Sequence, residues 1–253
     1  MSGFMKLKKA LEVGNSRVVV VPAQITLEQV HEVIQELFDW GRCHLWEFED
    51  AFGRIFSPDD GDLGWGRERK MLPPEEYCLC DLLPERGAKL KYTYDFGDNW
   101  RHVLTRMVDP KEHEIKCIKT TGVDGLEDVG GIWGLDESKD ECHSPTVEEL
   151  TERLLALDLT PHPEKQGKIK QAQTMLLKKI RALSPYDWEQ LVELGETGLA
   201  TPKILSWQFE TLVNDLPAVR SFCFGYQNSF HADREFKKFW KANKDMWFAA
   251  RQQ

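Results

Sequence analysis

Hydrophobic and polar positions in the first part of the chain switch between the two-residue alternation of strands and the 3.6-residue repeat of helices. Residues 17–21, Arg-Val-Val-Val-Val, form a β-branched apolar run that ends at Pro22, which is typical of a buried strand. Residues 6–13 precede this run, and the turn signal Gly-Asn-Ser at residues 14–16 separates the two segments. The pattern predicts a pair of strands at residues 6–13 and 17–22.

Two later segments carry helical stripes, and each opens with a capping box. Thr26 is followed three residues later by Gln29, and Thr146 by Glu149, the spacing at which the two side chains cap each other's backbone amides. Behind each box one helical face is apolar, with Leu27, Val30, Ile34 and Leu37 in the first segment and Val147, Leu150, Leu154 and Leu157 in the second. These patterns predict two helices, the first of which ends near Trp40.

Strict alternation returns in the middle of the chain. Within residues 90–96 the apolar and aromatic side chains Leu90, Tyr92, Tyr94 and Phe96 fall on one side. The turn signal Gly-Asp-Asn at residues 97–99 follows, so residues 100–108 are expected to complete a hairpin. The remaining pattern predicts strands at residues 43–48 and 112–120, a short strand or helical turn at 77–83, and long loops at 57–75 and 121–135.

Beyond residue 160 the pattern is helical only. Helices are expected at residues 165–183, from Ser184-Pro185, from Thr201-Pro202 and at residues 234–248. The charge changes as well: residues 161–253 hold 14 Lys and Arg against 10 Asp and Glu, or +4, whereas residues 1–160 hold 19 against 32, or −13. We predict two domains, residues 1–160 and 161–253, whose ordinary surfaces attract each other.

Composition narrows the class of protein. Hydrophobic content of 41% and charged content of 30% are ordinary for a globular chain. No stretch approaches the ~20 apolar residues that cross a bilayer, and the N-terminus lacks the pattern of a signal peptide. We therefore expect a cytoplasmic protein with no membrane partner.

The six cysteines form no compact framework of disulfide spacing. A zinc site could draw on Cys78, Cys80, Cys117 and the Cys142-His143 pair, but paired Cys-x2–4-Cys knuckles are missing. Buried apolar thiols are the preferred interpretation, and no metal is predicted.

The densest chemistry lies at the predicted hairpin, where Asp95, Asp98 and His102 surround the turn together with Trp100. Carboxylates and imidazole suit a divalent metal that activates water, and the set could be completed by His44, Glu127 and Asp128. The structural alternative is that the acids hydrogen-bond their own turn and that the histidine packs in the core. We favour this alternative.

The last predicted helix mixes basic and aromatic residues: Lys237, Lys238, Lys241, Trp240 and Trp247. This mixture can hold single-stranded nucleic acid through charge and stacking. The competing interpretation, which we prefer, is an amphipathic helix that docks on its own domain.

Four blocks stand in order along the first 160 residues: Leu27 to His31 with Ile34; Trp40 with His44, Leu45 and Phe48; Tyr94 to His102; and Cys117 followed by Glu127 to Gly131. In this order they resemble the plasmid pRiA ORF-3-like family, which occurs on plasmids, as passenger genes of insertion sequences and in chromosomes. The resemblance covers about residues 6–158. It departs at Ser16-Arg17, where the family usually has Trp-Arg-Arg, and at Gly125-Leu126, which replaces prolines.

The resemblance implies an α+β fold with a mixed, largely antiparallel sheet and packed helices, to which the all-helical C-terminal domain is added. It implies no particular reaction and identifies no cofactor. We expect a non-enzymatic binding or accessory protein associated with mobile elements, with a protein or a nucleic acid as partner. Two alternatives stay open: a metal-dependent hydrolase using Asp95, Asp98 and His102, and a nucleic-acid binder acting through the last helix.

Overall fold

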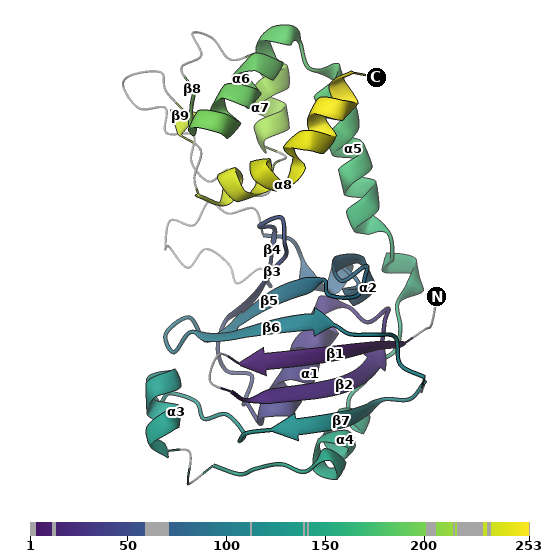
Figure 1. The fold of residues 1–253 in the computed structure, drawn as a ribbon, viewed down its shortest axis with the longest axis vertical. Coiled ribbons are helices and arrows are strands. Elements are labelled where there is room, and N and C mark those ends of the chain that lie inside the picture. The colour runs from purple at the N-terminus through teal and green to yellow at the C-terminus, as the bar shows by residue number, and fades with distance from the viewer. Residues whose placement is uncertain are drawn as a thin grey trace. The chain divides into compact units, whose positions relative to one another are not determined.

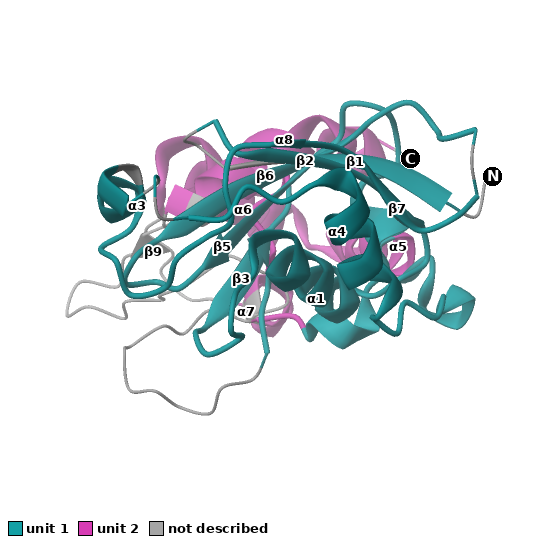
Figure 2. Ribbon diagram, turned by 90° about the horizontal axis from the view of Figure 1, so that it is seen from below, with its two compact units in different colours: residues 1–50, 56–58, 73–169 teal, residues 51–55, 59–72, 170–253 magenta. Residues whose placement is uncertain are grey.

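The computed structural model describes residues 4–11, 14–58, 71–111, 113–138, 140, 142–200, 206–214, 216, 230–231 and 234–252. The chain divides into two compact units, the first formed by residues 1–50, 56–58 and 73–169, and the second by residues 51–55, 59–72 and 170–253 (Figure 2). The domain boundary at residues 160/161 stays a prediction.

A seven-stranded sheet forms the body of the first unit, in the order β4-β3-β5-β6-β1-β2-β7 (Figure 1). Its strands are β1 (Phe4–Leu11), β2 (Ser16–Pro22), β3 (Trp46–Glu49), β4 (Ile55–Phe56), β5 (Lys89–Tyr94), β6 (Trp100–Arg106) and β7 (Lys116–Thr121). The pairings of β1 with β2 and β6, of β2 with β7, and of β5 with β3 and β6 are antiparallel. The expected α+β class is confirmed.

Strand β2 shows why the valine run forms the middle of a sheet. It lies between β1 and β7, and every residue from Arg17 to Pro22 is buried. Since successive side chains point to opposite faces, β2 is covered on both faces. Continuous apolar sequence is therefore needed, and the one charged member, Arg17, must find partners inside the protein.

Both predicted capping boxes are present. Helix α1 (Leu27–Phe38) begins at Thr26, whose side chain accepts from the Gln29 amide while the Gln29 side chain accepts in return. Helix α4 (Val147–Leu155) begins at Thr146 in the same way, with Glu149 as its partner. Both helices lie on one face of the sheet (Figure 2). The remaining helical segments of this unit are short: η1 (Pro74–Glu76), α2 (Leu79–Leu82), α3 (Ile132–Ser138) and η2 (Pro163–Lys165).

The predicted hairpin of β5 and β6 is also present, with Tyr94 opposite Trp100 and Tyr92 opposite His102. The alternation holds from Leu90 to Tyr94. Phe96 departs from it because β5 ends at Tyr94 and the chain enters the turn. Two further expectations need correction, because the third strand begins only at Trp46 and the loop at 121–135 gives way to α3 at Ile132.

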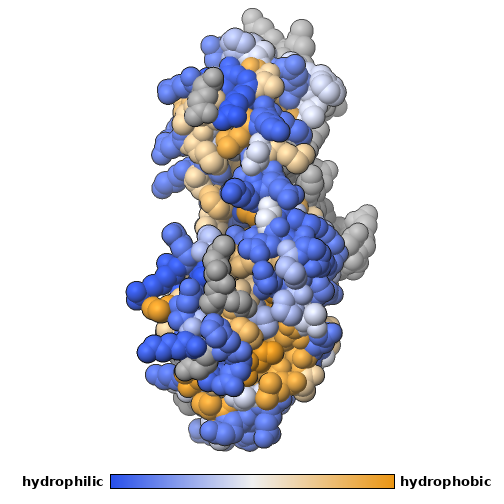
Figure 3. Space-filling view, turned by 90° about the vertical axis from the view of Figure 1, so that its right-hand side faces the viewer, coloured by the Kyte–Doolittle hydropathy of each residue, from blue (hydrophilic) through white to orange (hydrophobic). Residues whose placement is uncertain are grey.

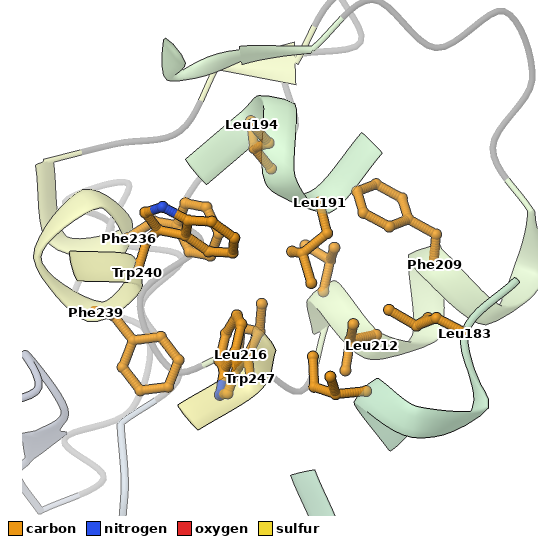
Figure 4. Close-up of a cluster of buried hydrophobic side chains, with 12 residues drawn as sticks. Leu183, Leu191, Leu194, Phe209, Leu212, Leu216, Phe236, Phe239, Trp240 and Trp247 are labelled. Carbon is orange, nitrogen blue, oxygen red and sulfur yellow. The ribbon is translucent and has the colours of Figure 1, made fainter. Parts of the chain in front are cut away.

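The second unit holds α5 (Lys168–Ala182), α6 (Pro185–Thr197), α7 (Trp207–Asn214) and α8 (Arg234–Arg251). Their apolar faces meet in one cluster, into which Trp240 and Trp247 point (Figure 4). The expectation of helices alone is wrong in one detail, since β8 (Leu199–Ala200) and β9 (Phe230–His231) form a short antiparallel pair. The predicted helix start at Thr201-Pro202 lies outside the described residues.

The surface of the first unit is mixed. Figure 3 shows apolar residues, in orange, gathered on one part of it, and the apolar side chains that this unit exposes include Val108, Ile118 and Leu155. No helix among the described residues is long and apolar enough to cross a membrane.

Candidate functional site

The turn between β5 and β6 is shaped by Asp95. This residue adopts a left-handed backbone conformation with φ 53°, which aspartate tolerates better than most residues. Its Oδ1 atom accepts hydrogen bonds from the amides of Gly97 at 2.9 Å and Asp98 at 3.3 Å. Its own amide donates to the Leu45 carbonyl at 2.9 Å. The Oδ1 atom is therefore engaged in the turn, and the Oδ2 atom is left for contacts outside it.

Asp98 joins this turn to the glycine-rich loop. Its Oδ2 atom accepts from the Val129 amide at 3.0 Å. Two residues on, Gly131 has φ 75°, and a Cβ atom there would lie 2.5 Å from the Asp98 carbonyl oxygen. The two segments thus pack backbone against backbone, which only glycine permits at this position.

Trp100 and His102 face the core. His102 is 1% exposed and Trp100 is fully buried. The imidazole lies edge-on to the rings of Phe38 and Trp40, each with centroids 5.1 Å away. The structure therefore places the expected acids at the turn and the expected imidazole among aromatic rings, and does not gather Asp95, Asp98 and His102 around one point.

A different histidine meets the acids. The Nε2 atom of His44 lies 3.7 Å from Asp95 Oδ2 and 3.5 Å from Asp128 Oδ1. The His44 side chain is 24% exposed and that of Asp128 79%, so solvent reaches the group. His44 Nε2 itself is buried, and no hydrogen bond to it is found in the part of the chain that the structure describes.

Glu127 reaches the same place from the glycine-rich loop. Its Oε1 atom accepts from the Tyr94 hydroxyl at 2.5 Å and from the Gly41 amide at 3.1 Å, and its Oε2 atom accepts from the Cys43 thiol at 3.4 Å. Partial burial acts to raise the pKa of Glu127, but these hydrogen bonds outweigh it and hold the pKa below its usual value. Burial, followed by the bond to Glu127, raises the pKa of Tyr94.

We call Cys43, His44, Asp95, Glu127 and Asp128 the turn cluster. Two sets within it could hold a metal ion, Cys43 with His44 and Glu127, and His44 with Asp95 and Asp128; in each set the candidate ligand atoms lie within 4.8 Å of one another. Cys43 is an unexpected member of the turn cluster, because its thiol was expected to be buried but is exposed. Its position beside His44 was the available signal.

The other proposed zinc ligands do not converge in the described residues. The Cys78 thiol donates to the carbonyl of His162 at 3.3 Å. The Cys117 thiol donates to the Lys119 carbonyl at 3.5 Å, and His143 lies 3.3 Å from Glu149. These side chains therefore have separate local partners.

Arg17 positions the loops that carry the cluster. Its guanidinium is fully buried. It donates to the carbonyl of the adjacent Ser16 at 3.3 Å and to three carbonyls distant in the sequence, those of Leu37 at 3.2 Å, Thr121 at 2.6 Å and Val123 at 2.8 Å. Leu37 lies near the end of α1, before the loop with Cys43, and the other two open the glycine-rich loop. Asp124, 3.6 Å away, supplies the countercharge.

Helix α8 turns its aromatic side inward. Trp240 is 2% exposed and Trp247 is fully buried, whereas Lys237 and Lys241 are exposed and Lys238 is half-buried. The rings needed for base stacking are therefore part of the core of the second unit.

The family model of the plasmid pRiA4b ORF-3-like protein matches residues 7–163. This chain belongs to that family. A curated relative, the uncharacterized protein y4hQ of Sinorhizobium fredii (strain NBRC 101917 / NGR234), is 34% identical over 143 residues, which cover 54% of this chain and 71% of the relative.

A solved structure is also similar, a protein of unknown function, MM3350, from Methanosarcina mazei Go1. It is 26% identical, with a TM-score of 0.45, and the match covers 64% of this chain and 95% of that one. Within this pRiA4b ORF-3-like chain, three blocks that carried the resemblance meet at the turn cluster: His44, Asp95 and Glu127 come from one block each.

Proposed function

We propose that this pRiA4b ORF-3-like protein is a non-enzymatic binding protein whose ligand contacts the turn cluster. An accessory role on a mobile element is part of the proposal and rests on the family resemblance. The observation that carries the non-enzymatic part is the separation of the expected catalytic groups. Carboxylate oxygens of Asp95 and Asp98 accept hydrogen bonds from backbone amides, and His102 is only 1% exposed.

A hydrolase built on Asp95, Asp98 and His102 would need an acid and the His102 imidazole within hydrogen-bond reach of one solvent-reachable point. A carboxylate held by backbone amides and a histidine enclosed by rings supply turn geometry and packing instead. The hydrolase alternative is therefore supported less well than binding.

The chemistry of the turn cluster favours a cationic ligand. Three carboxylates, one thiol and one imidazole lie close together in the turn cluster, and residues 1–160 carry a formal charge of −13. The one basic residue in the loop before Cys43 is Arg42, whose guanidinium pairs with Glu32 at 2.6 Å and with Glu36 at 2.5 Å. Because Arg42 is held by these two glutamates, it does not neutralise the turn cluster. An incoming cation would therefore meet acceptor groups that this arginine leaves available.

The nucleic-acid alternative is supported less well, because Trp240 and Trp247, the α8 tryptophans expected to stack on bases, are buried. Single-stranded oligonucleotides are expected to leave the tryptophan fluorescence unchanged at low salt. Salt-sensitive quenching that is abolished by Lys237→Glu with Lys241→Glu would contradict this expectation and favour the alternative.

The test of the binding proposal is hydrogen exchange of the full chain with a panel of cations: basic peptides, polyamines and divalent metal ions. At least one member is expected to protect residues 41–45, 95–99 and 122–131. Asp128→Asn should weaken that protection, because it removes an exposed carboxylate. Glu85→Gln, which removes an exposed carboxylate elsewhere, is the matched control and should change nothing.

Equal weakening in both variants would mean that only overall charge attracts the ligand, and would count against the turn cluster. The non-enzymatic part is tested by assaying phosphoester, ester and peptide hydrolysis with Mg²⁺, Mn²⁺ and Zn²⁺. Turnover that disappears in His102→Gln and Asp95→Asn, with the fold intact by circular dichroism, would overturn it.

A further inference from the structure

We propose that Cys43, His44 and Glu127 form a binding site for a divalent transition-metal ion of the Zn²⁺ class. The inference rests on the proposed function and names its ligand. A thiol, an imidazole nitrogen and a carboxylate oxygen lie within 4.8 Å of one another. This donor set mixes soft and borderline ligands, which selects Zn²⁺ and its neighbours over Mg²⁺ or Ca²⁺.

The distances require only a small contraction. Tetrahedral zinc, with Zn–S near 2.3 Å and Zn–N or Zn–O near 2.0 Å, places its ligand atoms about 3.3–3.6 Å apart. Cys43 Sγ and Glu127 Oε2 are already 3.4 Å apart. Rotation of the half-exposed His44 ring would bring its nitrogen within the same range, and the exposed position of Cys43 leaves the fourth site to water.

The surroundings orient the ligands as metal sites require. Metal-binding carboxylates are themselves hydrogen-bonded, and the Tyr94 hydroxyl and Gly41 amide both donate to Glu127 Oε1. This leaves Oε2 directed at Cys43. Tyr94 is in turn fixed by stacking on Trp40, with ring centroids 4.7 Å apart.

The two aspartates act on the other side of the imidazole. His44 Nε2 faces Asp95 and Asp128 at 3.7 Å and 3.5 Å. Carboxylates accept hydrogen bonds and cannot donate them, so they favour the tautomer with the proton on Nε2. The lone pair is then on Nδ1, which we assign as the ligand atom. Metal-binding histidines usually donate their other N–H to a carboxylate, and Asp95 and Asp128 face Nε2 from just outside hydrogen-bond distance.

Binding is accompanied by proton release. A cysteine thiol with its ordinary pKa of about 8.5 is mostly protonated at neutral pH. The metal ligand is the thiolate. One S–H bond is broken, one metal–sulfur bond forms, and one proton passes to the buffer for each ion bound.

The experiment is a titration of the chelator-treated full chain with Co²⁺, which replaces Zn²⁺ and absorbs in the near ultraviolet when a thiolate binds it. One equivalent of Co²⁺ is expected to produce this band and to release one proton, and Zn²⁺ should displace it. Cys43→Ser should remove the band and the proton release. Cys142→Ser, which removes a thiol outside the cluster, should retain both.

Glu127→Gln and His44→Gln should each weaken Zn²⁺ binding at least about tenfold in competition with a chelator. Asp128→Asn tests the positioning role. It should reduce affinity while leaving the thiolate band in place, because Asp128 does not contact the ion.

Absence of the band in the wild-type chain, or its persistence in Cys43→Ser, would overturn the metal site. The two proposals fail differently. A basic peptide that protects the three loops of the chelator-treated protein, without any cobalt band, overturns the metal site and leaves the binding function standing. Hydrolysis by a chain that shows the band supports the metal site and overturns the non-enzymatic function.

Discussion

Replacement of Arg17 by methionine should destabilise the first unit by at least about 3 kcal/mol. The change keeps most of the side-chain volume but removes a fully buried charge that donates to the carbonyls of Leu37, Thr121 and Val123. Hydrogen bonds to charged groups contribute about 1.5–3 kcal/mol each and are not additive. Removing one partner of a buried ion pair costs about 3–5 kcal/mol, because the other partner stays buried.

In this protein the partner left behind is Asp124, which is 3% exposed. It retains Arg153, 3.1 Å away, so the lower end of the range applies. Even this loss is a large fraction of the free energy of unfolding of a typical protein, which is ~5–15 kcal/mol. Arg17→Lys should recover part of it at most, since an ammonium group cannot reach three carbonyls in the way that a planar guanidinium does.

The assay combines urea unfolding with hydrogen exchange, because a chain with two compact units need not unfold in one step. Exchange should accelerate first in residues 36–42 and 121–129, which Arg17 connects. Arg101→Met is the matched control: Arg101 is exposed on β6 and donates to the Asn99 side chain, so its loss should cost within about 0.5 kcal/mol. An Arg17→Met protein within about 1 kcal/mol of the wild type would refute the scaffold role.

Two further predictions concern the turn cluster. Gly131→Ala should destabilise the protein clearly more than Gly87→Ala, as measured by urea unfolding. Both glycines have positive φ, but only at Gly131 does the added Cβ meet a carbonyl oxygen, 2.5 Å away. Equal losses of stability would contradict the close packing. Burial and Glu127 raise the pKa of Tyr94 above 10, so its contribution to stability is complete below pH 10 and is lost as the pH rises further. Tyr94→Phe should therefore flatten the fall in stability above pH 10 by up to about 1.4 kcal/mol per pH unit, and an unchanged slope in Tyr94→Phe would disprove the shift.

The local sequence was sufficient to predict the structure wherever the stabilising interactions lie within a few residues of each other. Thr26 and Thr146 open helices because each cap satisfies amides within three residues. The β5–β6 register follows from a short turn that leaves little freedom to the flanking strands. The stripe of α8 indicated a buried face, and the cluster around Trp240 and Trp247 bears this out (Figure 4).

The candidate site was predictable only in part. Asp95, Glu127 and His44 were recognised as polar residues of the right chemistry, and His102 was expected to pack in the core, as the structure shows. His102 alternates onto the inner face of β6, opposite Tyr92, so the period-2 rule that placed it near the turn also buries it. Cys43 was expected to be buried because cysteines usually are. That average does not describe the particular loop in which Cys43 lies, where the side chain is exposed.

The sequence alone predicted the longer helices and strands of this protein, their order and which side of each is apolar, because capping, turn chemistry and periodicity act over a few residues. The tertiary structure decided which loops meet: Cys43 reaches Glu127 across 84 positions, and Asp98 reaches Val129 across 31. Those contacts depend on the sheet order and on the buried Arg17 that ties the loops together. No local pattern encodes them, because their free energy comes from the packing of segments distant in the chain.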